Sequence, residues 1–226
     1  MSFHAGQSFT FGETPSATKW NYLWENDYAL ADGTGISDNA IDSRHYVDGS
    51  IDPEHLASTI GNYQVLYDSG EQVGTSTSMS SGTITAKNLL RILAWIIPSG
   101  GTLNIGIRFN NDSAANYAER SEVNGGELNG GADSTVASLN QINTKTAIDA
   151  NPQFTYLEGY NTSANEKLFI ASSVMRGSAG ANAPERKEGV YKWVNTSAQI
   201  TRVDAVDTGG TGDIGAGSRL LVLGRD

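Results

Sequence analysis

Residues 103–117 hold the sequence feature that most constrains the fold, an alternating strand that runs into a polar turn. From Leu103 to Phe109 every second residue is large and apolar, which is the pattern of a strand with one buried face. Short polar side chains follow at once, and such side chains hydrogen-bond to turn backbone and tolerate left-handed conformations. We therefore expect a strand that ends in a structured turn, with a tyrosine folding back to anchor it. The residues of this predicted turn are Asn110, Asn111, Asp112, Asn116 and Tyr117.

The rest of the second half of the chain predicts more strands. The 26 glycines and the many Ser, Thr and Asn residues favour short strands joined by turns. We expect a mainly β domain over 61–226, an antiparallel β-sandwich of jelly-roll type with no strongly periodic helix. The further candidate strands are 63–67, 87–97, 136–142, 153–160, 167–175, 189–194, 199–206 and 218–224.

Two details of connectivity follow from the same patterns. Pro98 to Gly101 separates two apolar runs, so 87–97 and 103–109 are expected to form an antiparallel hairpin. The Gly- and Asn-rich stretch 121–135 is expected to be a long loop, and long loops are usually functional or mobile.

Residues 1–60 are predicted to form a separate anchor and stalk. Thr14 and Pro15 are typical of a helix start, and the stripe that follows has the i, i+3, i+4 spacing of one helix face. A short helix cannot bury two tryptophans by itself, so this stripe packs either on the rest of the chain or on a partner. The stripe residues are Trp20, Leu23 and Trp24.

A short repeat follows, with Ile41 to Tyr46 aligned on Ile51 to Leu56. Each copy has too little apolar surface for a core of its own, and such repeats become stable by stacking or by winding around identical chains. A plain extended linker is the alternative. If the segment is a stalk, we expect Ile41 and Ile51 to contact sister subunits or other partner subunits. His45 and His55, at equivalent positions, could then form rings around the axis.

Composition excludes several classes of function. A net charge of −10 and a pI near 4.7 oppose nucleic-acid binding, which depends on Lys and Arg at phosphates. The absence of Cys removes disulfides and thiolate metal sites. Met1 to His4 does not begin a signal peptide, and the longest apolar run, Leu89 to Ile97, is about half the length of a membrane-spanning helix. No nucleic-acid partner and no membrane insertion are expected.

Catalytic and cofactor patterns are weak. The glycines of 210–215 match a dinucleotide fingerprint, but a β pattern follows them where a helix is required. No His occurs in 61–226, so a Ser-His-Asp triad is excluded there. Asn110 to Asp112 offers oxygens but lacks the glycine and glutamate of an EF-hand. The carboxylates that could serve a glycosidase are Glu119, Glu122, Glu127, Asp133, Asp149 and Glu158, and no spacing pairs them. We expect no enzyme, cofactor or metal.

Several stretches together resemble a known class of protein. The segment Arg108-Phe109-Asn110-Asn111-Asp112, with Asn116-Tyr117 after it, is similar to a segment of tailed-bacteriophage virion structural proteins of the head decoration, head fibre or minor tail fibre type. The apolar strand before it, the Thr14 to Lys19 start and the end at 214–224 fit the same proteins. The closing Val222-Leu223-Gly224 departs from them, because relatives usually have Tyr where Leu223 stands.

The resemblance implies a virion structural protein, assembled in the host cytoplasm and carrying a C-terminal β-sandwich. It implies a capsid decoration or head fibre that is anchored by residues 1–60, forms a homotrimer and contacts capsid or tail proteins. Polar loops at 121–135, 160–165 and 177–184 would then face solvent or a host-surface glycan. The alternatives are a tail fibre receptor-binding protein and a non-viral carbohydrate-binding module.

Overall fold

The computed structural model describes residues 12, 14, 16–18, 21, 63–140, 142–143, 151–177, 180–209 and 211–226, with 126–132 described by their backbone alone. The chain divides into two compact units, Met1–Ala57 and Ser58–Asp226. In the first unit Ala17, Thr18 and Asn21 have helical backbone. The stripe residues Trp20, Leu23 and Trp24, the repeat residues Ile41 and Ile51, and all three histidines lie outside the described residues.

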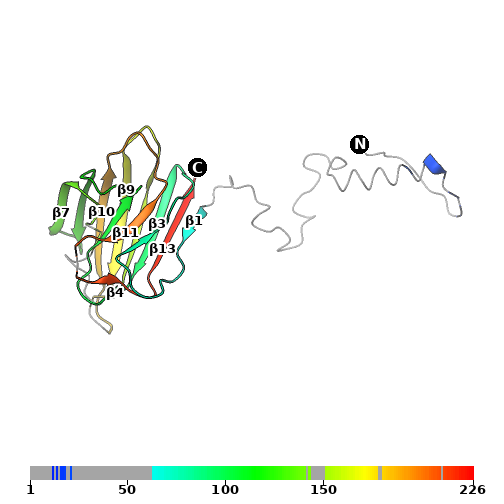
Figure 1. Ribbon diagram of the computed structural model, residues 1–226. Helices are drawn as coiled ribbons and strands as arrows, with labels where there is room; N and C mark the ends of the chain where they lie inside the picture. The colour runs from blue at the N-terminus through cyan, green and yellow to red at the C-terminus, as the bar shows by residue number, and fades with distance from the viewer. Residues whose placement is uncertain are drawn as a thin grey trace. The chain divides into compact units, whose positions relative to one another are not determined.

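The second unit is built from antiparallel strands, as the sequence predicted (Figure 1). An eight-stranded sheet has the order β1-β13-β3-β8-β9-β10-β6-β7. A three-stranded sheet has the order β2-β11-β5, and β12 pairs with β4. The bounds are β1 Gln64–Asp68, β2 Ser78–Ser80, β3 Leu89–Ile96, β4 Pro98–Ser99, β5 Ile105–Phe109, β6 Tyr117–Val123, β7 Gly126–Val136, β8 Gln153–Tyr160, β9 Lys167–Met175, β10 Glu185–Trp193, β11 Val203–Asp207, β12 Asp213–Ile214 and β13 Arg219–Arg225.

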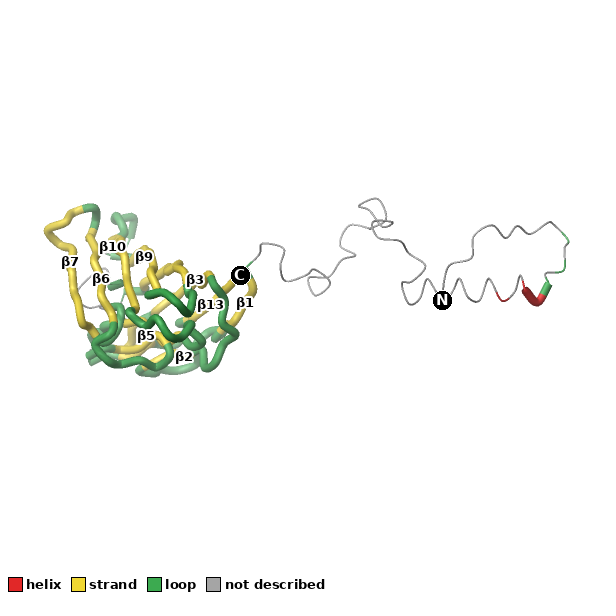
Figure 2. The backbone as a smooth tube through the Cα atoms, turned by 90° about the horizontal axis from the view of Figure 1, so that it is seen from above, coloured by secondary structure: helices red, strands yellow, loops and turns green. Residues whose placement is uncertain are grey.

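The two larger sheets form layers with one shared core. Figure 2 shows β5 and β2 along one side of the row made by β7, β6, β10, β9, β3, β13 and β1. In β9 every second residue from Lys167 to Met175 is buried, so one face of the large sheet points into the core. Phe109 of β5 stacks on Phe169 of β9 at 5.0 Å between ring centroids, which joins the layers directly. We call the core-facing side of the large sheet its inner face and the other side its outer face.

The predicted hairpin of 87–97 with 103–109 is wrong. β3 pairs with β13 and β8 in the large sheet, whereas β5 pairs with β11 in the small one. The connection carries the chain from one layer to the other, because Pro98–Ser99 forms β4 against β12 and the carbonyl of Ile97 accepts from Gly215 N at 2.6 Å. Each apolar run therefore finds its partners far away in sequence.

The long loop predicted at 121–135 is also wrong, since β6 and β7 form a hairpin across most of it. Asn124 and Gly125, at φ of 52° and 75°, make the two-residue turn between paired Val123 and Gly126. Asn-Gly is the preferred sequence for a turn of this kind. β7 lies at the edge of the sheet, where a Gly-rich strand is tolerated. The predicted strand at 136–142 is reduced to the end of β7 and an isolated bridge between Leu139 and Ile107.

Candidate functional site

The polar turn after β5 is present and adopts a left-handed backbone. Asn110 and Asn111 have φ of 53° and 58°, and Asp112 N donates to the carbonyl of Phe109 at 2.9 Å. Asparagine adopts this region more readily than most residues because its short side chain bonds locally. The strand therefore ends where the sequence predicts.

Asp112 ties this turn to the large sheet. Its carboxylate accepts from Trp193 Nε1 at 2.8 Å, from Asn116 Nδ2 at 2.9 Å and from Ala114 N at 2.9 Å. Burial acts to raise the pKa of Asp112, but these three hydrogen bonds outweigh it and hold the pKa below its ordinary value. The carboxylate is thereby kept ionised as a structural acceptor.

Asn110 and Tyr117 add further hydrogen bonds between this turn and the sheets. We call Asn110, Asp112, Asn116 and Tyr117 together the joint. Asn110 Oδ1 accepts from Thr201 N at 2.8 Å and Arg202 N at 3.1 Å, and Nδ2 donates to Gln199 O at 2.9 Å. The Tyr117 hydroxyl accepts from Phe109 N at 2.9 Å and donates to a carbonyl, while burial raises the pKa of that hydroxyl. The polar atoms are occupied within the chain, and no group of three His, Cys, Asp or Glu residues suited to a metal ion occurs in the described part of the chain. This segment is a structural joint.

The candidate carboxylates fall on different faces of the large sheet. Glu119 and Asp133 are directly opposite each other on β6 and β7, and Glu119 is buried on the inner face. Lys187 is buried near them; burial lowers its pKa, and the charges of Glu119 and Asp133 act in the opposite direction. Glu122 and Glu158 have outer-face positions, and the side chain of Glu127 and all of Asp149 lie outside what the structure describes.

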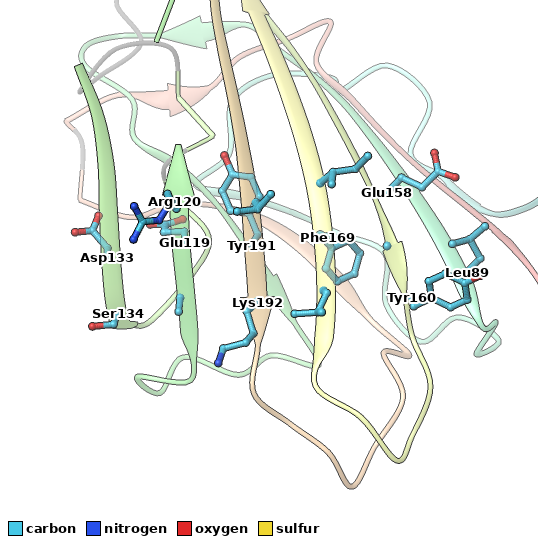
Figure 3. A pocket seen from close by; sticks show the side chains of 15 residues that line it. Leu89, Glu119, Arg120, Asp133, Ser134, Glu158, Tyr160, Phe169, Tyr191 and Lys192 are labelled. Atoms are coloured by element: carbon cyan, nitrogen blue, oxygen red, sulfur yellow. The ribbon is translucent and has the colours of Figure 1, made fainter. Parts of the chain in front are cut away.

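An open hollow lies on the outer face of the large sheet (Figure 3). It is an open groove of about 890 Å³ that crosses β3, β8, β9, β10, β6 and β7. Figure 3 shows Tyr160 beside Leu89 at one end and Arg120 toward the other. Its floor is apolar, because Leu168 and Ile170 of β9 are each 60% exposed and Val190 of β10 is 54% exposed. Exposed apolar surface of this extent is typical of interaction sites.

Glu158, which lines this groove, forms an ion pair with Arg91 of β3. Arg91 Nη2 donates to Glu158 Oε2 at 2.9 Å, and the hydroxyls of Tyr63 and Tyr156 also donate to the Glu158 carboxylate. The Arg91 guanidinium lies 4.2 Å from the centre of the Tyr63 ring. Burial acts to raise the pKa of Glu158, but the Tyr63 and Arg91 hydrogen bonds and the charge of Arg91 lower it overall. The charges of Arg91 and Glu158 therefore compensate each other on the outer face.

Sequence reasoning missed the outer face, although a signal for it was present. Leu89 to Ile96 and Lys167 to Ala171 are nearly continuous apolar runs, not strict alternations. Continuous runs are the pattern of strands covered on both faces. The predicted site residues of the turn are brought together by the structure. Of the candidate carboxylates that the structure describes, Glu158 lines the groove from the outer face, and Glu119 and Asp133 also border it although Glu119 is buried on the inner face.

The described part of the chain is thus a mainly β protein with antiparallel sheets, a polar joint inside and an apolar groove outside. No known protein family matches the chain, and searches of curated proteins and of solved structures find no match either. Among the described residues no helix is long and apolar enough to cross a membrane.

Proposed function

We propose that this protein is a structural component of a tailed-bacteriophage virion, either a capsid decoration protein or a head fibre. Residues 1–60 attach it to the particle, and the β domain of 61–226, a sandwich of jelly-roll type, projects from that anchor. The chain assembles as a homotrimer, contacts capsid or tail proteins, and has no catalytic task.

The observation that carries this proposal is the joint centred on Asp112. The residues that resemble virion proteins, from Arg108 to Tyr117, are the residues that connect β5 with β10 and with the segment before β11. Side chains that hold layers together are determined by the fold, not by surface composition. A resemblance at such positions therefore supports a shared architecture, and the structural role is proposed by analogy with the proteins that it resembles.

The outer face agrees with this class of function. A virion protein works by being packed against other proteins, and such a protein needs a broad apolar surface more than a deep catalytic cleft. The groove over Leu168, Ile170 and Val190 is open and apolar, and two of its charged lining residues, Glu158 and Lys192, are already in ion pairs.

Antibody labelling or reconstruction of the assembled particle tests the proposal. Density with threefold symmetry on the head supports a decoration or fibre protein, and density at the tail tip supports the tail fibre alternative. Absence of the protein from every particle overturns the proposal. As a matched experiment, deletion of residues 1–60 is expected to leave a folded β domain that no longer joins the particle; incorporation at normal copy number would show that the β domain makes the contacts.

A carbohydrate-binding module is the second candidate, and it has one supporting observation. Trp95, Phe154 and Tyr160 expose 41%, 36% and 67% of their surface on the outer face, where rings can stack on sugars. Binding of a polysaccharide that is lost in Tyr160→Ala would favour it. Cleavage of a polysaccharide that is lost in Glu119→Gln would instead assign an enzyme.

A further inference from the structure

We propose that the outer face of the eight-stranded sheet is the surface through which copies of this chain pack against one another. This deepens the proposed function and rests on it for the presence of several copies. Its partner is a second copy of the same β domain, so residues 63–226 contribute directly to the oligomer, in addition to any contact made by the first 60 residues.

The exposed area is of the size that a protein interface requires. Taking roughly 200 Å² for each large apolar side chain, the exposed fractions on this face correspond to on the order of 900 Å². A standard interface buries about 800 Å² on each partner. The residues counted are Val65, Trp95, Phe154, Tyr160, Leu168, Ile170, Val174, Val190 and Val194.

These side chains form a continuous surface, because cross-strand pairing places them in rows. In one row Val174 of β9 is opposite Phe154 of β8, which is opposite Trp95 of β3. In the next, Val190 of β10 is opposite Ile170 of β9, and this row continues into the pair of Glu158 and Arg91. A third row runs through Leu168 and Tyr160 to Leu89. Branched aliphatic side chains dominate the outer face of β9, and Val190 of β10 adds another. These side chains have neither hydrogen-bonding groups nor ring faces for a sugar, which favours a protein partner.

The charge on this face also suits a second copy. The whole chain carries −10, so two copies repel each other over most of their surfaces. Among the described side chains of the outer face and its rim, six basic ones nearly balance five acidic ones. The basic residues are Arg91, Arg120, Arg186, Lys192, Arg219 and Arg225, and the acidic residues are Asp68, Glu122, Glu158, Glu166 and Glu188.

Most of these charges are paired within one chain. Besides Arg91 with Glu158, Lys192 pairs with Glu166 at 3.1 Å and Arg219 Nε donates to Asp68 Oδ1 at 2.8 Å. The face is therefore nearly neutral before association, and bringing two such faces together leaves few uncompensated charges. Where three outer faces meet around a threefold axis, one side of each face contacts the other side of the next, so the contact is heterologous and closes into a ring.

Labelling of single cysteines in the full-length protein tests this surface. The chain has no native Cys, so Ile170→Cys and Val190→Cys each introduce one thiol on the outer face. Val73→Cys is the matched control, because Val73 is 95% exposed and lies in the connection between β1 and β2. N-ethylmaleimide is expected to react about tenfold more slowly at positions 170 and 190 than at position 73, and equally fast at all three in urea.

The mass of the same samples, measured by light scattering, separates the outcomes. Slow labelling in a protein of multiple-chain mass supports the inference. Labelling at the rate of Val73→Cys overturns it, and slow labelling in a monomer overturns it too, because another segment of the same chain then covers the face. Adding Ile170→Asp to Val190→Cys is expected to restore fast labelling even if the first 60 residues hold the copies together. These measurements use free protein, so their failure is distinct from a failure to find the protein on a virion.

Discussion

The indole N–H of Trp193, in β10, donates a hydrogen bond of 2.8 Å to the carboxylate of Asp112, in the turn that follows β5. Trp193 is 1% exposed and its ring lies 5.9 Å from that of Phe109, so the bond is made at the edge of the aromatic core. One contact thus links the large sheet, the small sheet and the turn.

Asp112→Ala is expected to lower the free energy of unfolding by about 3 kcal/mol, because a buried indole N–H loses its charged acceptor and the turn loses two further bonds. Urea unfolding followed by tryptophan fluorescence measures this. Glu71→Ala, which replaces an exposed acidic residue, serves as the control and is expected to change stability by less than about 0.5 kcal/mol. Equal effects of the two substitutions would show that the hydrogen bonds of Asp112 do not stabilise the joint.

The same carboxylate predicts a dependence of stability on pH. The folded state lowers the pKa of Asp112, so its stabilising contribution is complete above the unfolded pKa of about 3.9 and is lost as pH falls through the folded value. Asp112→Asn is therefore expected to be less stable than the native protein at pH 7, with a difference that shrinks toward pH 3. Unfolding in urea at pH 7, 5 and 3 measures the difference. A constant difference would contradict this assignment.

Some pH dependence is expected to remain in Asp112→Asn. Its source is Asp68, whose pKa is lowered to about 2 by Arg219 and by Gly70 N, together with Glu158, whose pKa is also lowered. Adding Asp68→Asn to Asp112→Asn is expected to reduce the remaining pH dependence of stability at the acidic end of the pH range.

What the sequence predicts well is local. The candidate strands 153–160 and 167–175 are each predicted from the residues of one segment, and strands are found there. The turn at Asn110 to Ser113 depends on side chains that bond to their own backbone. Neither prediction requires knowledge of a distant partner.

The sequence predicts the pairing between distant strands poorly. β3 is separated from its partners β8 and β13 by many residues, and nothing in the local pattern of Leu89–Ile96 specifies them. The Gly-rich stretch within 121–135 predicts a loop because glycine weakens strands in general. At the sheet edge, pairing with β6 outweighs that preference. The apolar surface of the outer face could not be predicted from the sequence, because its residues come together only through the pairing register of six strands.

Asn110 and Asn111 provide a matched pair that separates backbone conformation from hydrogen bonding. Both have positive φ, and Asn110 alone is described as bonding to the chain before β11. Asn111→Gly is expected to be neutral or to stabilise slightly, because glycine adopts this conformation without strain. Asn110→Gly is expected to cost about 1–3 kcal/mol, since Thr201 N and Arg202 N lose their acceptor. Thermal unfolding of both variants tests this prediction. Equal changes in stability would mean that the side-chain hydrogen bonds of Asn110 do not stabilise the protein.

The Arg91 and Glu158 pair predicts a non-additive effect. The two side chains are 33% and 21% exposed, so solvent weakens their attraction, and Glu158→Leu or Arg91→Met alone is expected to cost about 1–2 kcal/mol by leaving one charge on an apolar face. The double variant replaces the pair by apolar groups and is expected to cost less than the sum of the single changes. Urea unfolding of the four proteins gives the coupling energy. If the outer face packs against a second copy, the double variant should also associate more strongly at a given concentration, because the added side chains are apolar; additive stabilities with unchanged association would contradict both parts of this prediction.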